Sequence, residues 1–131
     1  MRTFLGLLMI ANAGLFFFGA LQHAGVRIGQ FHEPRILPAT VVETTCAAFL
    51  VWSGVAVLAN TDARWRNSLI GNLVALAGVL LGMVALAAGR GPRTTSNDLY
   101  HRIMLILIAV SLYFTWSLKK GAEGVDSSRV K

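Results

Sequence analysis

The sequence predicts an all-α integral membrane protein, a bundle of four transmembrane helices. Of its 131 residues, 55% are hydrophobic and only 14% are charged, whereas about a quarter of the residues in a soluble domain are charged. Four apolar segments approach the roughly 20 residues that a helix needs to cross a bilayer. They are expected at 3–21, 39–59, 69–88 and 99–118. Residues 1–120 should therefore form one membrane domain.

Each segment has its own supporting signals. The first is longer than the roughly 7–15 apolar residues of a signal peptide and no convincing cleavage site follows it, so we expect it to remain as a helix. Pro38 directly precedes the second and can occupy the first turn of a helix at no hydrogen-bond loss. The third contains Asn72 as its one polar side chain, and Thr95 and Asp98 before the fourth match a capping box. The polar segment 121–131 is expected to be disordered.

Four spans place both chain ends on one side of the membrane. That side carries more of the lysines and arginines, which favours the cytoplasmic side of the plasma (inner) membrane. Trp52, Trp65 and Trp116 lie toward the same side, as in an aromatic belt. The net charge is +6, but the basic residues flank apolar segments. Lipid headgroups are therefore the expected counter-charge, and nucleic acid is not an expected partner.

Small residues recur along the third segment at alternating spacings of four and three. On a helix this spacing draws one continuous stripe, and small residues permit the close backbone approach that holds membrane helices together. We expect a helix-packing interface, either inside the bundle or with another membrane subunit or a second copy. The stripe consists of Gly71, Ala75, Gly78, Gly82, Ala85 and Gly89.

Histidines and carboxylates gather on the side opposite the chain ends. These side chains are ligands of zinc, copper and iron, so the layer is a candidate metal site, although no H-x-x-x-H or E-x-x-H spacing supports it. The alternative is that these groups lie in the hydrated headgroup zone. Embedded haem is not expected, because its ligation needs two facing histidines near mid-depth. The candidate ligands are His23, His32, Glu33, Glu43, Asp98 and His101.

Glu43 is the sharpest single candidate, because it lies five residues past Pro38 in an apolar run. Acids in membrane spans usually face the bundle interior and mark ligand or ion pathways; the structural alternative is a helix-start acid paired with a basic group. Asn12 lies at mid-membrane and shares a helix face with His23. With His101, these residues form the candidate ligand or proton site. An interhelical hydrogen bond is the alternative for Asn12, and the same kind of bond is expected for Asn72 of the third segment.

A sequence pattern extends over most of the chain. Residues 5–8 read Leu-Gly-Leu-Leu, residues 16–19 read Phe-Phe-Phe-Gly, and after a long polar link residues 38–43 read Pro-Ala-Thr-Val-Val-Glu. This pattern resembles the DoxX-like group of small four-span bacterial membrane proteins. The resemblance implies an association with quinol oxidation or another membrane redox complex, and Glu43 is the residue to which a functional role would carry over.

These observations favour a non-catalytic accessory or structural subunit of a larger membrane complex, such as a respiratory one, or a homo-oligomer. Two alternatives stay open. The first is a membrane redox subunit that binds a metal ion or a quinone headgroup at the layer of histidines and carboxylates. The second is a small transporter or channel that uses Glu43. The chain has no phosphate-binding glycine loop, nucleophile elbow or HExxH motif that would indicate an enzyme.

Overall fold

The computed structural model describes residues 1–28, 34–91 and 94–129, with side chains as far as Lys119. These residues form four α-helices, which confirms the predicted all-α class: α1 (Arg2–His23), α2 (Leu37–Leu58), α3 (Arg64–Ala87) and α4 (Thr95–Arg129). All four are long and apolar enough to cross a membrane, α4 over its part Thr95–Lys119.

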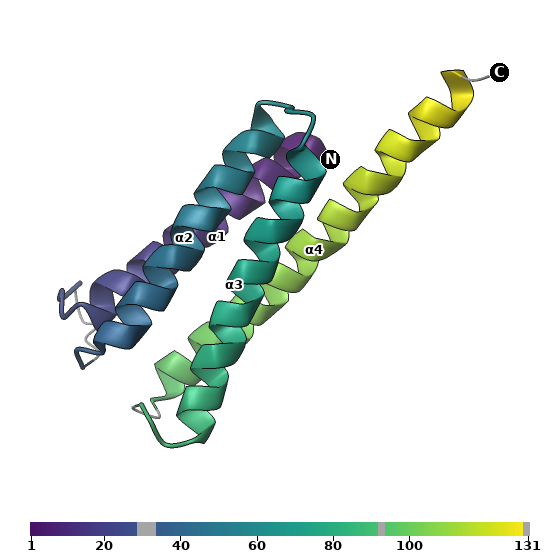
Figure 1. The fold of residues 1–131 in the computed structure, drawn as a ribbon. Coiled ribbons are helices and arrows are strands. Elements are labelled where there is room, and N and C mark those ends of the chain that lie inside the picture. Colours follow the sequence, from purple (N-terminus) through teal and green to yellow (C-terminus); the bar gives the residue numbers. More distant parts are fainter. Residues whose placement is uncertain (29–33, 92–93, 130–131) are drawn as a thin grey trace.

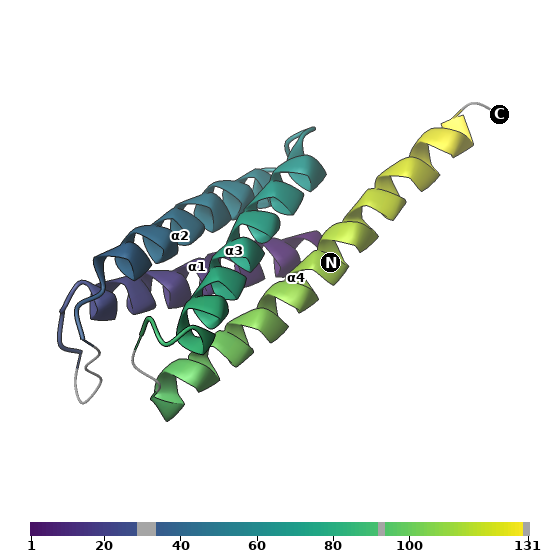
Figure 2. The ribbon, with the colours of Figure 1, turned by 60° about the horizontal axis from the view of Figure 1, so that its bottom comes forward.

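The helices run alternately up and down, so that each packs beside the next along the chain (Figure 1). The most extensive contact joins α1 to α2, and α4 closes the bundle by packing on both α3 and α1. The N-terminus and the last turns of α4 lie at one end, and α4 projects well beyond the other three helices there (Figures 1 and 2). We call the opposite end, where α1 ends and α4 begins, the His23 end.

Local signals set the helix ends at the His23 end. Pro38 lies in the first turn of α2, where its missing N–H removes no helical hydrogen bond. The cap of α4 differs from the prediction by one residue: Thr94 Oγ1, not Thr95, accepts the hydrogen bond from the Asn97 N–H at 3.2 Å. Asp98 instead binds Arg102 one turn later, at 2.9 Å.

The far end of α4 also differs from the expected span. The apolar segment ends near 118, but the helix continues to Arg129. The segment 121–131, for which the sequence predicted disorder, is thus helical up to that residue. Before it, Lys119 Nζ lies 5.0 Å from the ring centre of Trp65 and 5.4 Å from that of Trp116. These cation–π contacts join the start of α3 to α4.

Part of the small-residue stripe packs α3 against α2 of the same chain. A Cβ added at Gly71 would collide with Ser53 Oγ and would lie 3.0 Å from the Phe49 carbonyl oxygen. A Cβ added at Gly78 would collide with Cys46 Sγ. Both glycines therefore permit the close approach of the two helices that the stripe predicted, and both face the interior of this bundle.

The rest of the stripe has several roles. Ala75 is completely buried in the core, and Gly82 is covered by the His101 ring of α4. Ala85 borders a cavity described below. Gly89 has a φ of +71° just after α3, and a Cβ there would meet no atom of the described residues within 4 Å. Gly89 is thus a helix-ending residue, and it makes no helix-packing contact within the described part of this chain.

The apolar core contains residues of all four helices, among them Phe16, Leu50, Val79 and Met104. A polar contact within it joins α3 to α4: Asn72 Nδ2 donates to Thr115 Oγ1 at 3.3 Å, and within α3 it also donates to the Ser68 carbonyl oxygen at 2.9 Å. The interhelical hydrogen bond expected for Asn72 is therefore present, between α3 and α4.

Candidate functional site

A buried ionisable pair joins α1 to α2. His23 lies in the last turn of α1 and Glu43 in the second turn of α2. The distance from His23 Nδ1 to Glu43 Oε2 is 2.8 Å, and the two residues are only 5% and 6% exposed. A carboxylate only accepts hydrogen bonds, so the histidine Nδ1–H donates. Two residues that the sequence singled out separately thus form one unit.

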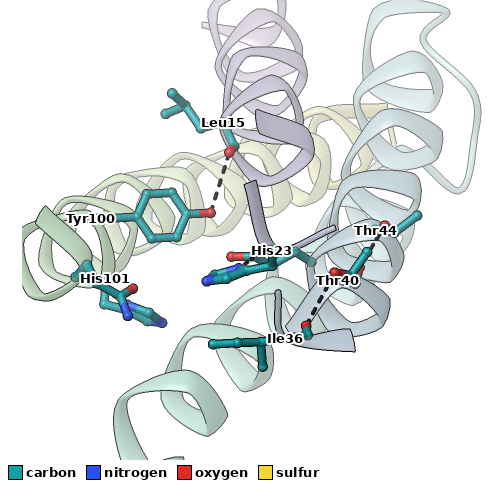
Figure 3. A network of polar contacts seen from close by, with 9 residues as sticks. Leu15, His23, Ile36, Thr40, Thr44, Tyr100 and His101 are labelled. Carbon is teal, nitrogen blue, oxygen red and sulfur yellow. Dashed lines mark hydrogen bonds and ion pairs between the residues drawn. The ribbon is translucent and has the colours of Figure 1, made fainter. Parts of the chain in front are cut away.

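Gly19 of α1 makes room for this pair. A Cβ at this position would lie 2.7 Å from Glu43 Oε1 and 2.8 Å from the Tyr100 hydroxyl oxygen. The carboxylate and the hydroxyl therefore both reach the bare backbone of α1. The Tyr100 hydroxyl also lies 3.4 Å from the Leu15 carbonyl oxygen, to which it donates (Figure 3).

Tyr100 was not among the predicted site residues. A tyrosine that is removed from water carries a polar tip that needs a partner, and the partly buried Tyr100 directly precedes His101 in the first turns of α4. A tyrosine expected at the same membrane depth as Glu43 is the feature of the sequence from which its place in the site could have been predicted.

His101 has a fixed orientation. Its Nδ1 lies 2.8 Å from the Asn97 carbonyl oxygen in the preceding turn of α4. Because a carbonyl only accepts, Nδ1 carries the hydrogen, and Nε2 is the acceptor of the neutral ring. Nε2 lies at Gly82 of α3, and the ring meets Tyr100 edge to face with centres 5.4 Å apart. Figure 3 shows the His23 and His101 rings pointing toward one another, with the Tyr100 hydroxyl beside them.

These side chains border a cavity of about 410 Å³ at the His23 end. Its volume lies within the range of small-molecule sites. Pro38 of α2 and Leu81 of α3 line it and are exposed, Leu81 by 57%, so the cavity opens between these two helices, which diverge toward this end (Figure 1). The polar lining residues are His23, Glu43, Arg90, Asn97, Tyr100 and His101, and the apolar ones include Phe16, Val42, Val79, Leu81, Ala85 and Leu86.

The predicted metal ligands are only partly brought together. His23, Glu43 and His101 border the cavity, but Asp98 is exposed on the outside of α4, where it pairs with Arg102. His32 and Glu33 lie outside the described residues. Among the residues that the structure describes, no three His, Cys, Asp or Glu side chains are grouped closely enough to hold a metal ion. We therefore do not derive a metal site.

Asn12 lies apart from the cavity. It shares the buried face of α1 with His23, as its spacing predicted, but Phe16 lies between them on that face. Asn12 is 1% exposed, and neither its Oδ1 nor its Nδ2 has a hydrogen-bond partner among the described residues. The interhelical hydrogen bond considered for it is thus absent from this part of the chain. An unsatisfied buried amide destabilises a fold by about 1–3 kcal/mol.

Asn12→Leu is therefore expected to raise the apparent melting temperature in detergent, because it removes an unsatisfied amide of similar size. Asn72→Leu is the matched control and should lower that temperature, since it breaks the hydrogen bonds to Ser68 and Thr115. A lower melting temperature for Asn12→Leu and a higher one for Asn72→Leu would contradict this prediction and show that the Asn12 amide is hydrogen-bonded in the protein.

No protein-family model, no curated protein and no solved structure matches the chain. The resemblance to DoxX-like proteins remains a prediction, and the functional conclusions rest on the contacts described above.

Proposed function

We propose that this chain is a multi-pass membrane protein that binds a lipid-soluble small molecule with a polar headgroup in the cavity at the His23 end. The observation that carries the proposal is the buried pair of His23 and Glu43 on the wall of an otherwise largely apolar cavity. Ionisable residues within membrane spans are costly, and they mark functional sites by default.

The cavity offers complementary hydrogen-bonding groups to a headgroup. The His23–Glu43 pair supplies a charged or proton-exchanging unit, Arg90 at the rim supplies donors, and the His101 Nε2 supplies an acceptor. Ligand sites typically combine apolar walls with a few such placed polar groups. A quinone headgroup, whose two oxygens accept hydrogen bonds, belongs to this class and agrees with the role implied by the DoxX-like resemblance.

The bilayer is the proposed source of the ligand. Large apolar side chains are exposed on every helix, including Leu7, Val41, Val84 and Ile106, and apolar surface of this extent supports contact with lipid. The opening between α2 and α3 would face that lipid, so an apolar ligand could enter without crossing water. Under the orientation favoured by the basic residues, this opening lies in the half of the membrane remote from the cytoplasm.

The other two functional hypotheses have less support. An accessory role in a larger complex was argued from the small-residue stripe, but Gly71, Gly78 and Gly82 pack against helices of the same chain. The stripe therefore no longer supports a partner, although a ligand-binding protein can also belong to a complex. For a transporter that uses Glu43, no contact specifically favours transport over binding.

Thermal stabilisation by two lipid-soluble probes tests the proposal. Decylbenzoquinone has an uncharged headgroup and oleate a charged one. A ligand at about 100 times its Kd stabilises a fold by about 2.7 kcal/mol, so at least one probe should raise the apparent melting temperature. Ala85→Phe, which fills the cavity, should abolish the effect. Ala77→Phe, at an exposed position of the same helix, should not. Stabilisation by neither probe, or equal stabilisation of both variants, would contradict the proposal.

A further inference from the structure

Arg90 is a cation at the rim of the cavity. It follows Gly89, and its backbone N–H donates to the Ala85 carbonyl oxygen at 2.9 Å, which holds it against the end of α3. Arg90 is one of the residues that line the cavity, and it is exposed. The ion pairs of the described residues are His23 with Glu43 and Arg102 with Asp98. Arg90 thus has no carboxylate partner in this part of the chain.

The described charges around the rim leave an excess of positive charge. Glu43 is bound by His23, and Asp98 is engaged by Arg102 on the outer side of α4. Arg27 and Arg35, in the link after α1, add further cations at the same end of the bundle. An excess of one sign of charge around a cleft attracts ligands of the opposite sign.

From this arrangement we infer that the ligand of the cavity is an amphipathic anion, and the inference rests on the function proposed above. Its carboxylate or phosphate group lies at Arg90, whose guanidinium suits both groups. Its acyl chain lies along Leu81 and Ala85 and leaves through the opening between α2 and α3. A free fatty acid and an anionic phospholipid share this chemistry.

A comparison of oleate with oleyl alcohol separates the contribution of the charged headgroup from that of the hydrocarbon chain, because only oleate carries a carboxylate. Both would be titrated into the purified protein at a fixed detergent concentration, and the apparent melting temperature recorded. Oleate should bind at least tenfold more tightly than the alcohol. Arg90→Gln should weaken oleate binding about tenfold and leave the alcohol unchanged, because only the charged head uses the guanidinium. Arg102→Gln is the matched control: this arginine is exposed and pairs with Asp98, so oleate binding should stay as in the wild type.

A second experiment, with phospholipids, identifies whether the anion is a phospholipid or a free fatty acid. In native mass spectrometry from mixed vesicles of phosphatidylglycerol and phosphatidylcholine, selective retention of phosphatidylglycerol that is lost in Arg90→Gln would support a phospholipid ligand. Selective retention of oleate would support a free fatty acid.

The inference and the proposed function fail in different ways. Equal binding of oleate and oleyl alcohol, abolished for both by Ala85→Phe, would overturn the anionic ligand and leave the cavity as a binding site. Equal loss of oleate binding in Arg90→Gln and Arg102→Gln would also overturn it. If Ala85→Phe changes the binding of no probe, including decylbenzoquinone and phosphatidylglycerol, the proposed function itself fails.

Discussion

Replacing His23 with leucine is expected to lower the free energy of unfolding by about 3–5 kcal/mol. This is the range seen when one partner of a buried ion pair is removed, because the other charge stays buried without compensation. Here Glu43 would keep its carboxylate 6% exposed with its partner gone. The measurement is the fraction of folded protein as a function of denaturing detergent, compared with the wild type.

A double-mutant cycle separates the pair from ordinary packing. His23→Leu with Glu43→Leu removes both groups, and replacing a buried ion pair by apolar side chains is often neutral or stabilising. The double variant should therefore recover most of the stability that His23→Leu loses. If the two single losses simply add, the residues do not form a coupled pair.

Glu43→Gln addresses function in the same pair. Glutamine preserves the size and one hydrogen-bonding oxygen, so the protein should still accumulate in the membrane, while the charge at the cavity wall is lost. We expect the affinity of the cavity for its ligand to change and the amount of protein in the membrane to stay as in the wild type. Asp98→Asn removes an exposed acid at the same end of the bundle and is the control that should change neither. Disappearance of the Glu43→Gln protein would indicate that the carboxylate is structural.

Gly71→Leu is expected to disrupt the contact of α2 with α3. Even the first added carbon would meet Ser53 and lie 3.0 Å from the Phe49 carbonyl oxygen, and a backbone atom cannot move aside without shifting its helix. Overpacking of this kind typically destabilises by about 1–3 kcal/mol, and a leucine adds three carbons beyond the first. We expect most of the protein to aggregate or to be degraded.

Gly14→Leu is the matched control for this change. Gly14 is also inside a helix, but a Cβ there meets nothing within 4 Å. Leucine exceeds glycine in helix propensity by up to about 1 kcal/mol, so this variant should be as stable as the wild type or slightly more so. Size-exclusion chromatography of both proteins after mild heating measures the difference. Equal recovery would show that α2 and α3 are not in close contact at Gly71.

The four helices could be predicted because lipid leaves few choices for an apolar chain. Long uncharged segments must satisfy their backbone groups internally, so composition alone fixes helix number and approximate bounds. The stripe correctly indicated tight packing at Gly71, Gly78 and Gly82. It could not indicate the partner helix, because helical spacing defines a face and says nothing about what covers it.

The candidate site was harder to predict, because its parts come from different helices. His23 and Glu43 are 20 residues apart, with no spacing rule that joins them; only the antiparallel packing of α1 and α2 does. Asn12 and His23 share a face, yet eleven helical residues rise about 16 Å, which separates them in depth. Asp98 lies at the same end of the bundle as the cavity but on the outer face of α4, where it pairs with Arg102. The place of Tyr100 in the site follows only from the packing of its hydroxyl beside Gly19 and Glu43.

Native mass spectrometry of the protein taken gently from its own membranes tests the ligand-binding cavity most directly. One lipophilic small molecule per chain should stay bound to the wild type and to Ala77→Phe, and should be absent from Ala85→Phe, whose added ring fills the cavity. A wild-type protein that carries no such molecule, or a bound molecule that Ala85→Phe retains equally well, would contradict a binding site between α2 and α3 at the His23 end.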